Sequence, residues 1–261
     1  MNVGAAPHRI VMLHGWGLNG AVFDRLATQL APRFDVLQLD LPGHGRSTAD
    51  VAVLEHGIDA LAAQLAAELD ATWPADGVPL HLLGWSLGGM AALALATAAP
   101  RRFKRLTLLA STPCFVARDG WPHGLAAAVL EQFAAHLRHD HRRTVHEFLE
   151  LQVRGSAQAG NTLRGLQAAL DARGAATTGA LAAGLELLRT TDLRDRLGVI
   201  DAPVLVIGGQ YDRVTPPWAM QALATALPRG EYREIARAGH APFLSHPQQV
   251  TDWLLEGVDA R

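Results

Sequence analysis

Cysteine is almost absent from this chain of 261 residues, and Cys114 is the only one. A single thiol cannot form an internal disulfide, so the composition fits a reducing compartment and we expect a cytoplasmic protein. No apolar run approaches the roughly 20 residues of a membrane-spanning helix. The first residues, Met1–Arg9, also lack the charged start and long apolar stretch of a secretory signal peptide.

An excess of charge of one sign is missing as well. The formal net charge is −2, so no overall field attracts nucleic acid or an acidic membrane surface. Charged residues make up 18% of the chain and hydrophobic residues 49%, which excludes intrinsic disorder. The length suits one large domain or two small ones and is sufficient to bury a substantial core. We expect a soluble, monomeric globular protein.

Short apolar segments alternate with helical patterns in the first and last parts of the chain. We predict strands at Ile10–Leu13, Val36–Leu39, Leu80–Leu83, Leu106–Ala110 and Val204–Ile207, and helices at Gly20–Leu30, Gly88–Ala99, Pro217–Leu227 and Gln248–Val258. Such alternation with buried strands predicts an α/β fold, in which helices cover both faces of a mostly parallel sheet.

The middle of the chain differs, because it shows helical patterns and no convincing strand. The predicted helices are Leu125–Arg138, Arg142–Val153, Asn161–Ala172 and Thr178–Leu188. We interpret residues 112–190 as a helical lid inserted into one discontinuous core of residues 1–111 and 191–261. A lid over the carboxyl ends of the strands can roof a mostly apolar pocket.

The segment Gly84–Gly89 reads Gly-Trp-Ser-Leu-Gly-Gly and lies directly between a predicted strand and a predicted helix. A serine on such a sharp turn needs small neighbours, because its backbone is strained and the helix passes close by. The amino terminus of the helix also stabilises negative charge near the serine. We therefore predict that Ser86 is a nucleophile; a chance glycine–serine turn is the alternative.

A serine nucleophile needs a base and an acid that orients the base. Asp212 follows a predicted strand, and His240 lies in a loop ahead of the last helix. The chain order Ser, Asp, His is the order of the α/β-hydrolases. The alternatives are a solvated loop aspartate and a structural histidine. Asp40 also ends a strand, but its place before Leu41–Gly45 suits a carboxylate that stabilises a turn.

The sequence His14-Gly15-Trp16-Gly17 follows the first predicted strand. In α/β-hydrolases the loop after an early strand supplies one oxyanion amide, and the residue after the nucleophile supplies the other. This predicts the amides of Trp16 and Leu87 as the oxyanion hole. A tight turn is the structural interpretation of His-Gly, and the two interpretations are compatible.

Histidine is concentrated in the predicted lid, at His123, His136, His139, His141 and His146. These residues are irregularly spaced among arginines that would repel a cation, so we predict no metal site. We expect Cys114 to be a small buried residue rather than a second nucleophile. Trp85 and Trp121 could wall the pocket, although packing in the core is the simpler interpretation.

Two groups of motifs can be compared with known families. Those shared widely among α/β-hydrolases are Leu13–Asn19, Asp40–Ser47 and Gly84–Gly89, and the more specific ones are Ser111–Phe115, Arg143–Val145, Phe148–Gln152, Gly184–Leu188 and Ala238–Phe243. Together these motifs resemble the pimeloyl-[acyl-carrier protein] methyl ester esterase family of biotin synthesis. The resemblance runs from about Ile10 to the last helix and includes the lid, which is the most variable part of the superfamily.

The resemblance implies a cofactor-free serine esterase that removes the methyl ester from a pimeloyl chain tethered to acyl carrier protein. It implies that Ser86 is the nucleophile, that His240 is general base and then acid, and that Asp212 orients His240. Trp16 and Leu87 would form the oxyanion hole. The implied substrate-binding set is Trp16, Ser86, Leu87, Phe148, Leu149, Glu150, Leu151, Gln152 and His240.

A protein-sized carrier cannot enter the pocket, so we expect it to dock on the rim of the lid. Arginine suits an acidic partner, since its planar fork binds phosphate and carboxylate groups. The candidates are Arg138, Arg142, Arg143, Arg154 and Arg164. Glu147 and Gly160 stand where further basic residues would be expected in this family, and the lid as a whole has a formal charge of only +1. The alternative for each arginine is a solvated helix face.

Three other functions fit the same motifs. The triad and lid could serve a generalist carboxylesterase for short acyl esters, or a carbon–carbon hydrolase or a lyase of menaquinone synthesis, because fold does not fix function. A non-catalytic receptor on the same fold would not need an intact triad. Haloalkane dehalogenase chemistry is excluded if Ser86 is the nucleophile, since that reaction uses a carboxylate at this position.

Overall fold

The computed structural model describes residues 8–73, 76–256 and 258, so the predicted features of residues 1–7 lie outside it. Its centre is a parallel sheet whose six strands stand in the order β2-β1-β3-β4-β5-β6. The strands are β1 (His8–Leu13), β2 (Phe34–Leu39), β3 (Leu80–Trp85), β4 (Arg105–Leu109), β5 (Val204–Gly209) and β6 (Gly230–Ile235). The predicted α/β class with a parallel sheet is confirmed.

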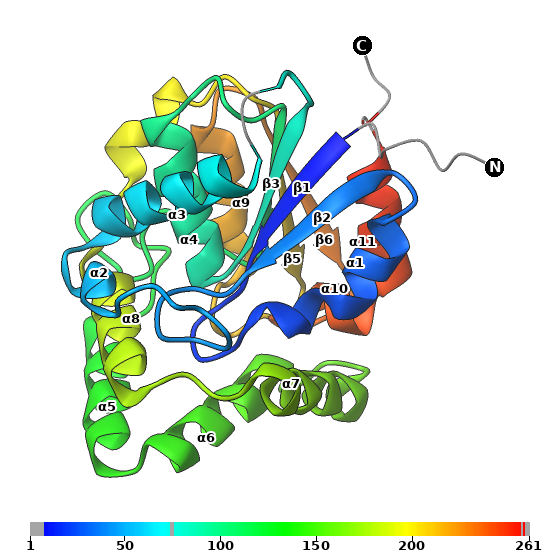
Figure 1. The fold of residues 1–261 in the computed structure, drawn as a ribbon. Coiled ribbons are helices and arrows are strands. Elements are labelled where there is room, and N and C mark those ends of the chain that lie inside the picture. The colour runs from blue at the N-terminus through cyan, green and yellow to red at the C-terminus, as the bar shows by residue number, and fades with distance from the viewer. Residues whose placement is uncertain (1–7, 74–75, 257, 259–261) are drawn as a thin grey trace.

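Helices cover both faces of this sheet, which explains why its inner strands are mostly apolar and buried (Figure 1). One face carries α3 (Ile58–Thr72), α4 (Leu87–Ala98) and α9 (Pro217–Ala226), and the short α2 (Ala52–Glu55) precedes α3. The other face carries α1 (Asp24–Leu30), α10 (Pro242–Ser245) and α11 (Pro247–Leu255). All six strands run in the same direction, so the loops that follow their carboxyl ends lie at one edge of the sheet.

The structure contains elements that the sequence analysis did not predict. Helix α3 buries Leu61, Leu65 and Leu69, and it packs against α4. Strand β6 lies at the edge of the sheet and is mostly polar and partly exposed, so it lacks the apolar run of the inner strands. The helix predicted over Gly20–Leu30 begins as a 3₁₀ turn, η1 (Gly20–Phe23), and the last helix ends at Leu255 rather than at Val258.

Four helices follow β4 in the chain and lie together beyond the edge of the sheet (Figure 1). They are α5 (Ala127–His139), α6 (His141–Val153), α7 (Ala159–Arg173) and α8 (Thr178–Thr190), after which η2 (Arg194–Val199) leads to β5. All four fall within residues 112–190, and the division of the chain into core and lid stays a prediction. Within the described part of the chain, no helix has both the length and the apolar character needed to cross a bilayer.

Polar contacts fasten the end of α7 to the core. The Asn19 side-chain amide donates hydrogen bonds to the carbonyls of Ala169 and Gly174, each at 2.9 Å. Arg173 forms an ion pair with Asp40 at 3.2 Å. Asp40 also accepts the backbone N–H groups of Gly20 at 2.5 Å and of Arg46 at 2.8 Å. Asp40 is therefore the turn-stabilising carboxylate predicted from its position, and it also helps to hold α7.

A buried histidine on β3 makes stability depend on pH. His81 is 5% exposed, and its ring lies 5.3 Å from that of His8 and 5.1 Å from that of Phe34, measured between centroids. Burial, with the positive charges of His8, Arg105 and Lys104, lowers the pKa of His81 to about 4. Between pH 6.5 and 4 the unfolded chain therefore binds a proton that the folded chain excludes.

We expect the free energy of unfolding to fall as the pH is lowered from 6.5 towards 4. His81→Phe should make this slope shallower by about 1.4 kcal/mol per pH unit, because one proton is removed from the linkage. Urea unfolding at closely spaced pH values measures the slope. His139→Phe, which changes an exposed histidine of α5, is the control and should leave the slope unchanged. Identical slopes for wild type and His81→Phe would contradict the prediction.

Candidate active site

Ser86 lies on the sharp turn between β3 and α4, with φ 55° and ψ −119°. This left-handed region is unusual for a residue with a side chain and signals a strained backbone. The turn is possible because its neighbours are glycines. A Cβ atom on Gly88 would lie 2.2 Å from the carbonyl oxygen of Leu13, and one on Gly84 would lie 2.4 Å from that of Gly88. Helix α4 therefore begins in direct contact with the ends of two strands.

The structure brings the three predicted triad residues together. The Nε2 atom of His240 lies 3.0 Å from Ser86 Oγ, and its Nδ1 atom lies 2.8 Å from Asp212 Oδ2. The other Asp212 oxygen accepts the backbone N–H groups of Val214 and Thr215, at 2.8 and 2.9 Å. Both carboxylate oxygens thus have partners, and the side chains of Asp212 and His240 are fully buried. This chain of hydrogen bonds can transfer a proton from the serine hydroxyl to the imidazole.

The loop after β1 lies against the serine. A Cβ atom on Gly15 would come within 3.2 Å of the Cβ atom of Ser86. Among the residues that the structure describes, the amides of Trp16 and Leu87 have no hydrogen-bond acceptor. The Leu87 amide is the first of helix α4, where amide groups have no partner within the helix. Two unpaired donors near a serine are the arrangement that an oxyanion requires.

His14 holds this loop in shape as a neutral side chain. Its Nε2 atom accepts the N–H group of Leu41 at 2.9 Å, so Nδ1 carries the proton and donates to the carbonyl of Gly15 at 2.8 Å. Burial lowers the pKa of His14 far below its usual value, and the neighbouring His44 lowers it further. His14 therefore supports the turn of the loop and does not carry a charge into the site.

An aromatic cluster forms the lid side of the site. The Trp16 ring makes an edge contact with Phe148 of α6 at 5.1 Å and one with Phe133 of α5 at 6.5 Å, both between centroids. The Trp16 indole N–H donates to the carbonyl of Leu181 on α8 at 2.8 Å. Sequence analysis missed Phe133. Its spacing from Leu130 and Leu137, three and four residues away, is the signal for the inner face of a helix.

The predicted substrate-binding segment Phe148–Gln152 is helical, so its residues do not share one face. Leu149 and Gln152 are buried, and Leu151 is half-buried. Glu150 is exposed and lies 3.7 Å from His146, one turn earlier, so the structure places it on the outer side of α6. Helical periodicity separates Glu150 from the residues that face the core.

The backbone of Gln152 links α6 to the loop of His240, because its carbonyl accepts the N–H group of His240 at 2.9 Å. Its side chain is 1% exposed, and neither amide atom has a hydrogen-bond partner among the described residues. Burying an amide without partners costs about 1–3 kcal/mol of stability. Unpaired buried polar groups are few in folded proteins, so this amide calls for a specific explanation.

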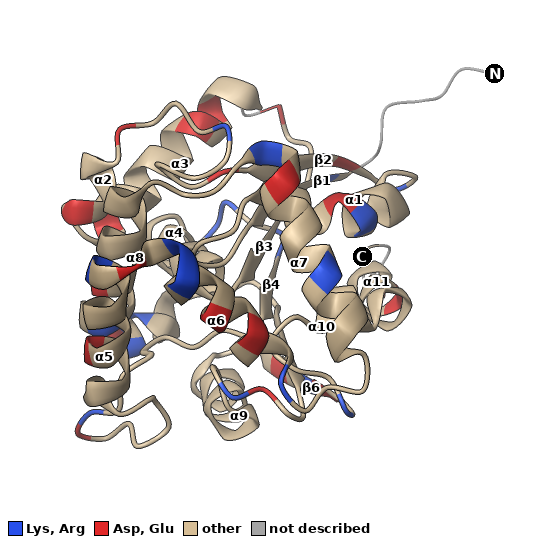
Figure 2. Ribbon diagram, turned by 90° about the horizontal axis from the view of Figure 1, so that it is seen from below, with Lys and Arg blue, Asp and Glu red and all other residues tan. Residues whose placement is uncertain are grey.

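The five arginines predicted for carrier docking are all exposed. Figure 2 shows that the basic segments of the lid alternate with acidic ones. Arg143 bonds to Glu147 at 2.8 Å, and Arg164 is hydrogen-bonded to Asn161. Among the described residues, no side-chain partner is found for the remaining three, which are Arg138, Arg142 and Arg154. Glu147 therefore neutralises a candidate arginine, whereas the exposed Gly160 adds no charge.

Cys114 and Trp121, which the sequence analysis considered, are buried and pack in the interior. Cys114 is buried, which raises the pKa of its thiol, and its Sγ lies 3.1 Å from the carbonyl of Val116. Trp121 is buried and donates its indole N–H to the carbonyl of Cys114 at 2.9 Å. Both fit the packing interpretation. In the described ranges, histidine, cysteine and carboxylate side chains form no group of three that could hold a metal ion.

Comparisons with known proteins agree with this geometry. A sequence model of the α/β hydrolase fold family matches residues 8–247. The chain is 43% identical to the pimeloyl-[acyl-carrier protein] methyl ester esterase of Stenotrophomonas maltophilia over 251 residues, which are 96% of this chain and 93% of that protein. The protein of the same name from Xanthomonas campestris is 41% identical over 260 residues, or 99% of this chain and 97% of its own length.

A solved structure gives the same fold at lower identity. The esterase EaEST from Exiguobacterium antarcticum matches with a TM-score of 0.84 and 22% identity, covering 95% of this chain and 91% of that one. The chain thus belongs to the α/β-hydrolase fold family and, within it, to the family of pimeloyl-[acyl-carrier protein] methyl ester esterases.

Proposed function

We propose that this protein hydrolyses the methyl ester at the far end of a pimeloyl chain tethered to acyl carrier protein, in biotin biosynthesis. The observation that carries the proposal is the 41–43% identity to esterases of that name over almost the whole chain, lid included. The hydrogen-bonded Ser86, His240 and Asp212 supply the chemistry that such an enzyme needs. The products are the carrier-bound pimeloyl chain with a free carboxylate, and methanol.

In the first half of the reaction, Ser86 Oγ attacks the ester carbonyl carbon while His240 Nε2 takes its proton. Asp212 stabilises the imidazolium and keeps the ring oriented. The amides of Trp16 and Leu87 donate hydrogen bonds to the developing oxyanion, and each such donor contributes about 3–4 kcal/mol to stabilising the transition state. His240 then gives its proton to the departing methoxide, and methanol leaves an acyl-enzyme.

In the second half, a water molecule replaces methanol. His240 Nε2 takes a proton from the water, the hydroxide attacks the acyl carbon, and the same two amides stabilise the new oxyanion. When the intermediate collapses, His240 returns the proton to Ser86 Oγ and the carboxylic acid is released, which then ionises by losing its proton to solvent. Each residue thus ends in its starting state, and no cofactor takes part.

Specificity in this reaction has to come from the acyl side, because a methyl ester has a very small leaving group. The cluster of Trp16, Phe133 and Phe148, with the buried Leu149, supports an apolar acyl slot between core and lid. Each methylene buried there contributes about 0.8 kcal/mol. The unpaired amide of Gln152 supports a polar contact to the substrate at the inner end of α6.

We further propose that acyl carrier protein docks transiently on the lid, whose residues we take as 112–190. Among the described residues, Arg138, Arg142 and Arg154 are the candidate arginines without a side-chain partner, which makes them the best-suited positive groups for an acidic carrier. A monomeric state and a cytoplasmic location remain predictions.

The function is tested by comparing kcat/KM for the carrier-linked pimeloyl methyl ester with kcat/KM for methyl butyrate. Both substrates release methanol, so the ratio reports the acyl chain and the carrier. We expect a preference of about 100-fold or more, since several further methylenes are buried. Ser86→Ala should abolish both activities. Equal values for the two esters would make the protein a generalist carboxylesterase and would overturn the proposed role.

Gln152→Met should raise stability and lower activity at once. The substitution removes an unpaired buried amide, so we expect the free energy of unfolding to rise by about 1 kcal/mol. It also removes a polar substrate contact, so kcat/KM for the carrier-linked ester should fall. Gln132→Met changes an exposed glutamine of α5 and should alter neither quantity. A destabilised Gln152→Met variant with unchanged kcat/KM would show that the amide serves the fold and not the substrate.

Arg142→Ala should weaken the reaction only when the carrier is present. An exposed charge contact contributes about 0.2–1 kcal/mol, so we expect kcat/KM for the carrier-linked ester to fall up to about fivefold. The loss should disappear in concentrated salt, which screens the contact, and methyl butyrate should be unaffected. Arg25→Ala, on helix α1 of the core, is the matched control. Equal losses on both esters would contradict docking through Arg142.

A further inference from the structure

The main chain of His240 lies in the loop between β6 and α10, where no helix or strand holds it. Two hydrogen bonds from other parts of the molecule fix it instead. Its N–H group donates to the carbonyl of Gln152 on α6 at 2.9 Å, and its carbonyl accepts the indole N–H of Trp85 at 2.8 Å. The main chain of His240 is therefore held by α6 through its N–H group and by β3 through its carbonyl.

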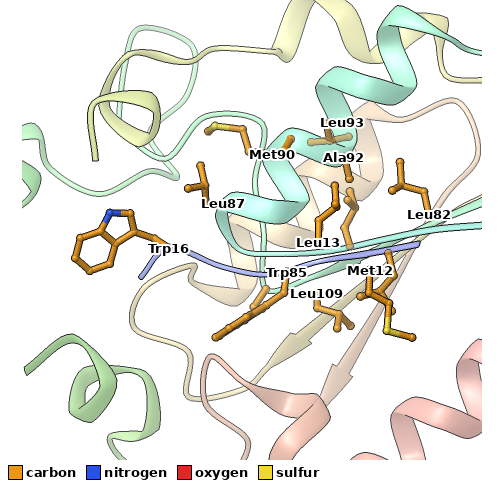
Figure 3. Packing of buried hydrophobic residues seen from close by; sticks show 14 of the residues in the cluster. Met12, Leu13, Trp16, Leu82, Trp85, Leu87, Met90, Ala92, Leu93 and Leu109 are labelled. Carbon is orange, nitrogen blue, oxygen red and sulfur yellow. The ribbon is translucent and has the colours of Figure 1, made fainter. Parts of the chain in front are cut away.

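Trp85 is buried and contacts several parts of the site, so its side chain can fix the position of the His240 loop. It is the last residue of β3, directly before Ser86, and it is 1% exposed. Figure 3 shows its side chain on the opposite side of the strand from Leu87 and Met90 of α4. The ring makes an edge contact with Phe243 of α10 at 5.1 Å between centroids, and it lies 5.7 Å from the His240 ring.

The same ring also contacts the oxyanion loop. A Cβ atom on Gly15 would lie 3.1 Å from Cε3 of Trp85. A single side chain thus touches the loop that carries the Trp16 amide and the loop that carries His240, and its own backbone precedes the nucleophile. Packing alone could be supplied by phenylalanine, but only tryptophan at this position also offers an N–H donor to the His240 carbonyl.

We infer that Trp85 is a positioning residue, whose indole N–H fixes the loop of His240 and thereby the 3.0 Å approach of Nε2 to Ser86 Oγ. Without this donor, the His240 carbonyl is left buried and unpaired, and the loop moves to find another partner. Proton transfer needs the base within hydrogen-bond reach, so a displacement of this kind slows chemistry. The inference rests on the proposed roles of Ser86 and His240, and it is independent of the natural substrate.

The molecule contains a matched control for the test. Trp121 is also buried, and it also donates its indole N–H to a backbone carbonyl, that of Cys114 at 2.9 Å. The substitutions Trp85→Phe and Trp121→Phe therefore remove the same atoms and the same kind of hydrogen bond. If Trp85 is a packing residue only, the two variants should behave alike in stability and in turnover.

The experiment measures thermal stability together with kcat and KM for p-nitrophenyl acetate, which needs the triad but not the carrier. We expect Trp85→Phe to lower kcat about tenfold or more with KM within about twofold, and to slow acyl-enzyme formation in the burst phase to the same extent. Trp121→Phe should keep kcat within about twofold despite a comparable loss of stability. Unchanged kcat in Trp85→Phe, or equal losses in both variants, would overturn the inference.

A second substitution covers the case in which Trp85→Phe does not fold. Replacing Trp85 by benzothienylalanine, in which sulfur takes the place of the N–H group, keeps the bicyclic ring and removes only the donor. The same loss of kcat is expected, and wild-type kcat would again refute the positioning role. Failure of the proposed function would appear separately, as wild-type protein that hydrolyses p-nitrophenyl acetate but does not prefer the carrier-linked methyl ester.

Discussion

The close approach of helix α4 to the ends of β1 and β3 is the constraint on which the rest of the site depends. Gly84 and Gly88 allow this contact, since a Cβ atom on either would overlap backbone. The turn between them forces Ser86 into the left-handed region and starts the helix at Leu87, whose amide then has no acceptor among the described residues. A strained serine and a free amide thus result from one packing requirement.

Buried polar groups around this turn are arranged without adding net charge to it. His14 stays neutral and connects the Leu41 amide to the Gly15 carbonyl. Asp40 is paired with Arg173 and with two backbone amides. Asp212, which contacts His240, is held by the backbone amides of Val214 and Thr215. A developing oxyanion would therefore meet dipoles that are already oriented, which is the condition for strong electrostatic stabilisation in a buried site.

Much of the fold and the triad could be predicted because their signals are local. The inner strands are apolar runs, and the Gly-x-Ser-x-Gly turn lies between a strand and a helix. Strand β6 escaped prediction because it is a polar edge strand, stabilised by pairing with β5 rather than by its own pattern. Helix α3 carries a helical signal in Leu61, Leu65 and Leu69, which the sequence analysis did not use.

The lid contacts could not be predicted, because they join residues far apart in the chain. The hydrogen bond from Trp16 to Leu181 spans 165 residues, and those from Asn19 to Ala169 and Gly174 span 150 and 155. No periodicity within a segment encodes such pairs. Glu150 shows that a motif alone can also mislead. It lies in a motif that resembles a substrate-binding segment, but the helix directs its side chain outward.

The hydrogen bond from His240 to the carbonyl of Gln152 also limits how this protein can be altered. Helix α6 supplies a carbonyl acceptor to the loop of His240, so a change in this helix also affects that loop. A lid grafted from another hydrolase would have to present a carbonyl at the same point in order to leave the base in place. Exchange of the segment that holds α5 to α8 is therefore restricted here by backbone geometry rather than by the chemistry of any side chain.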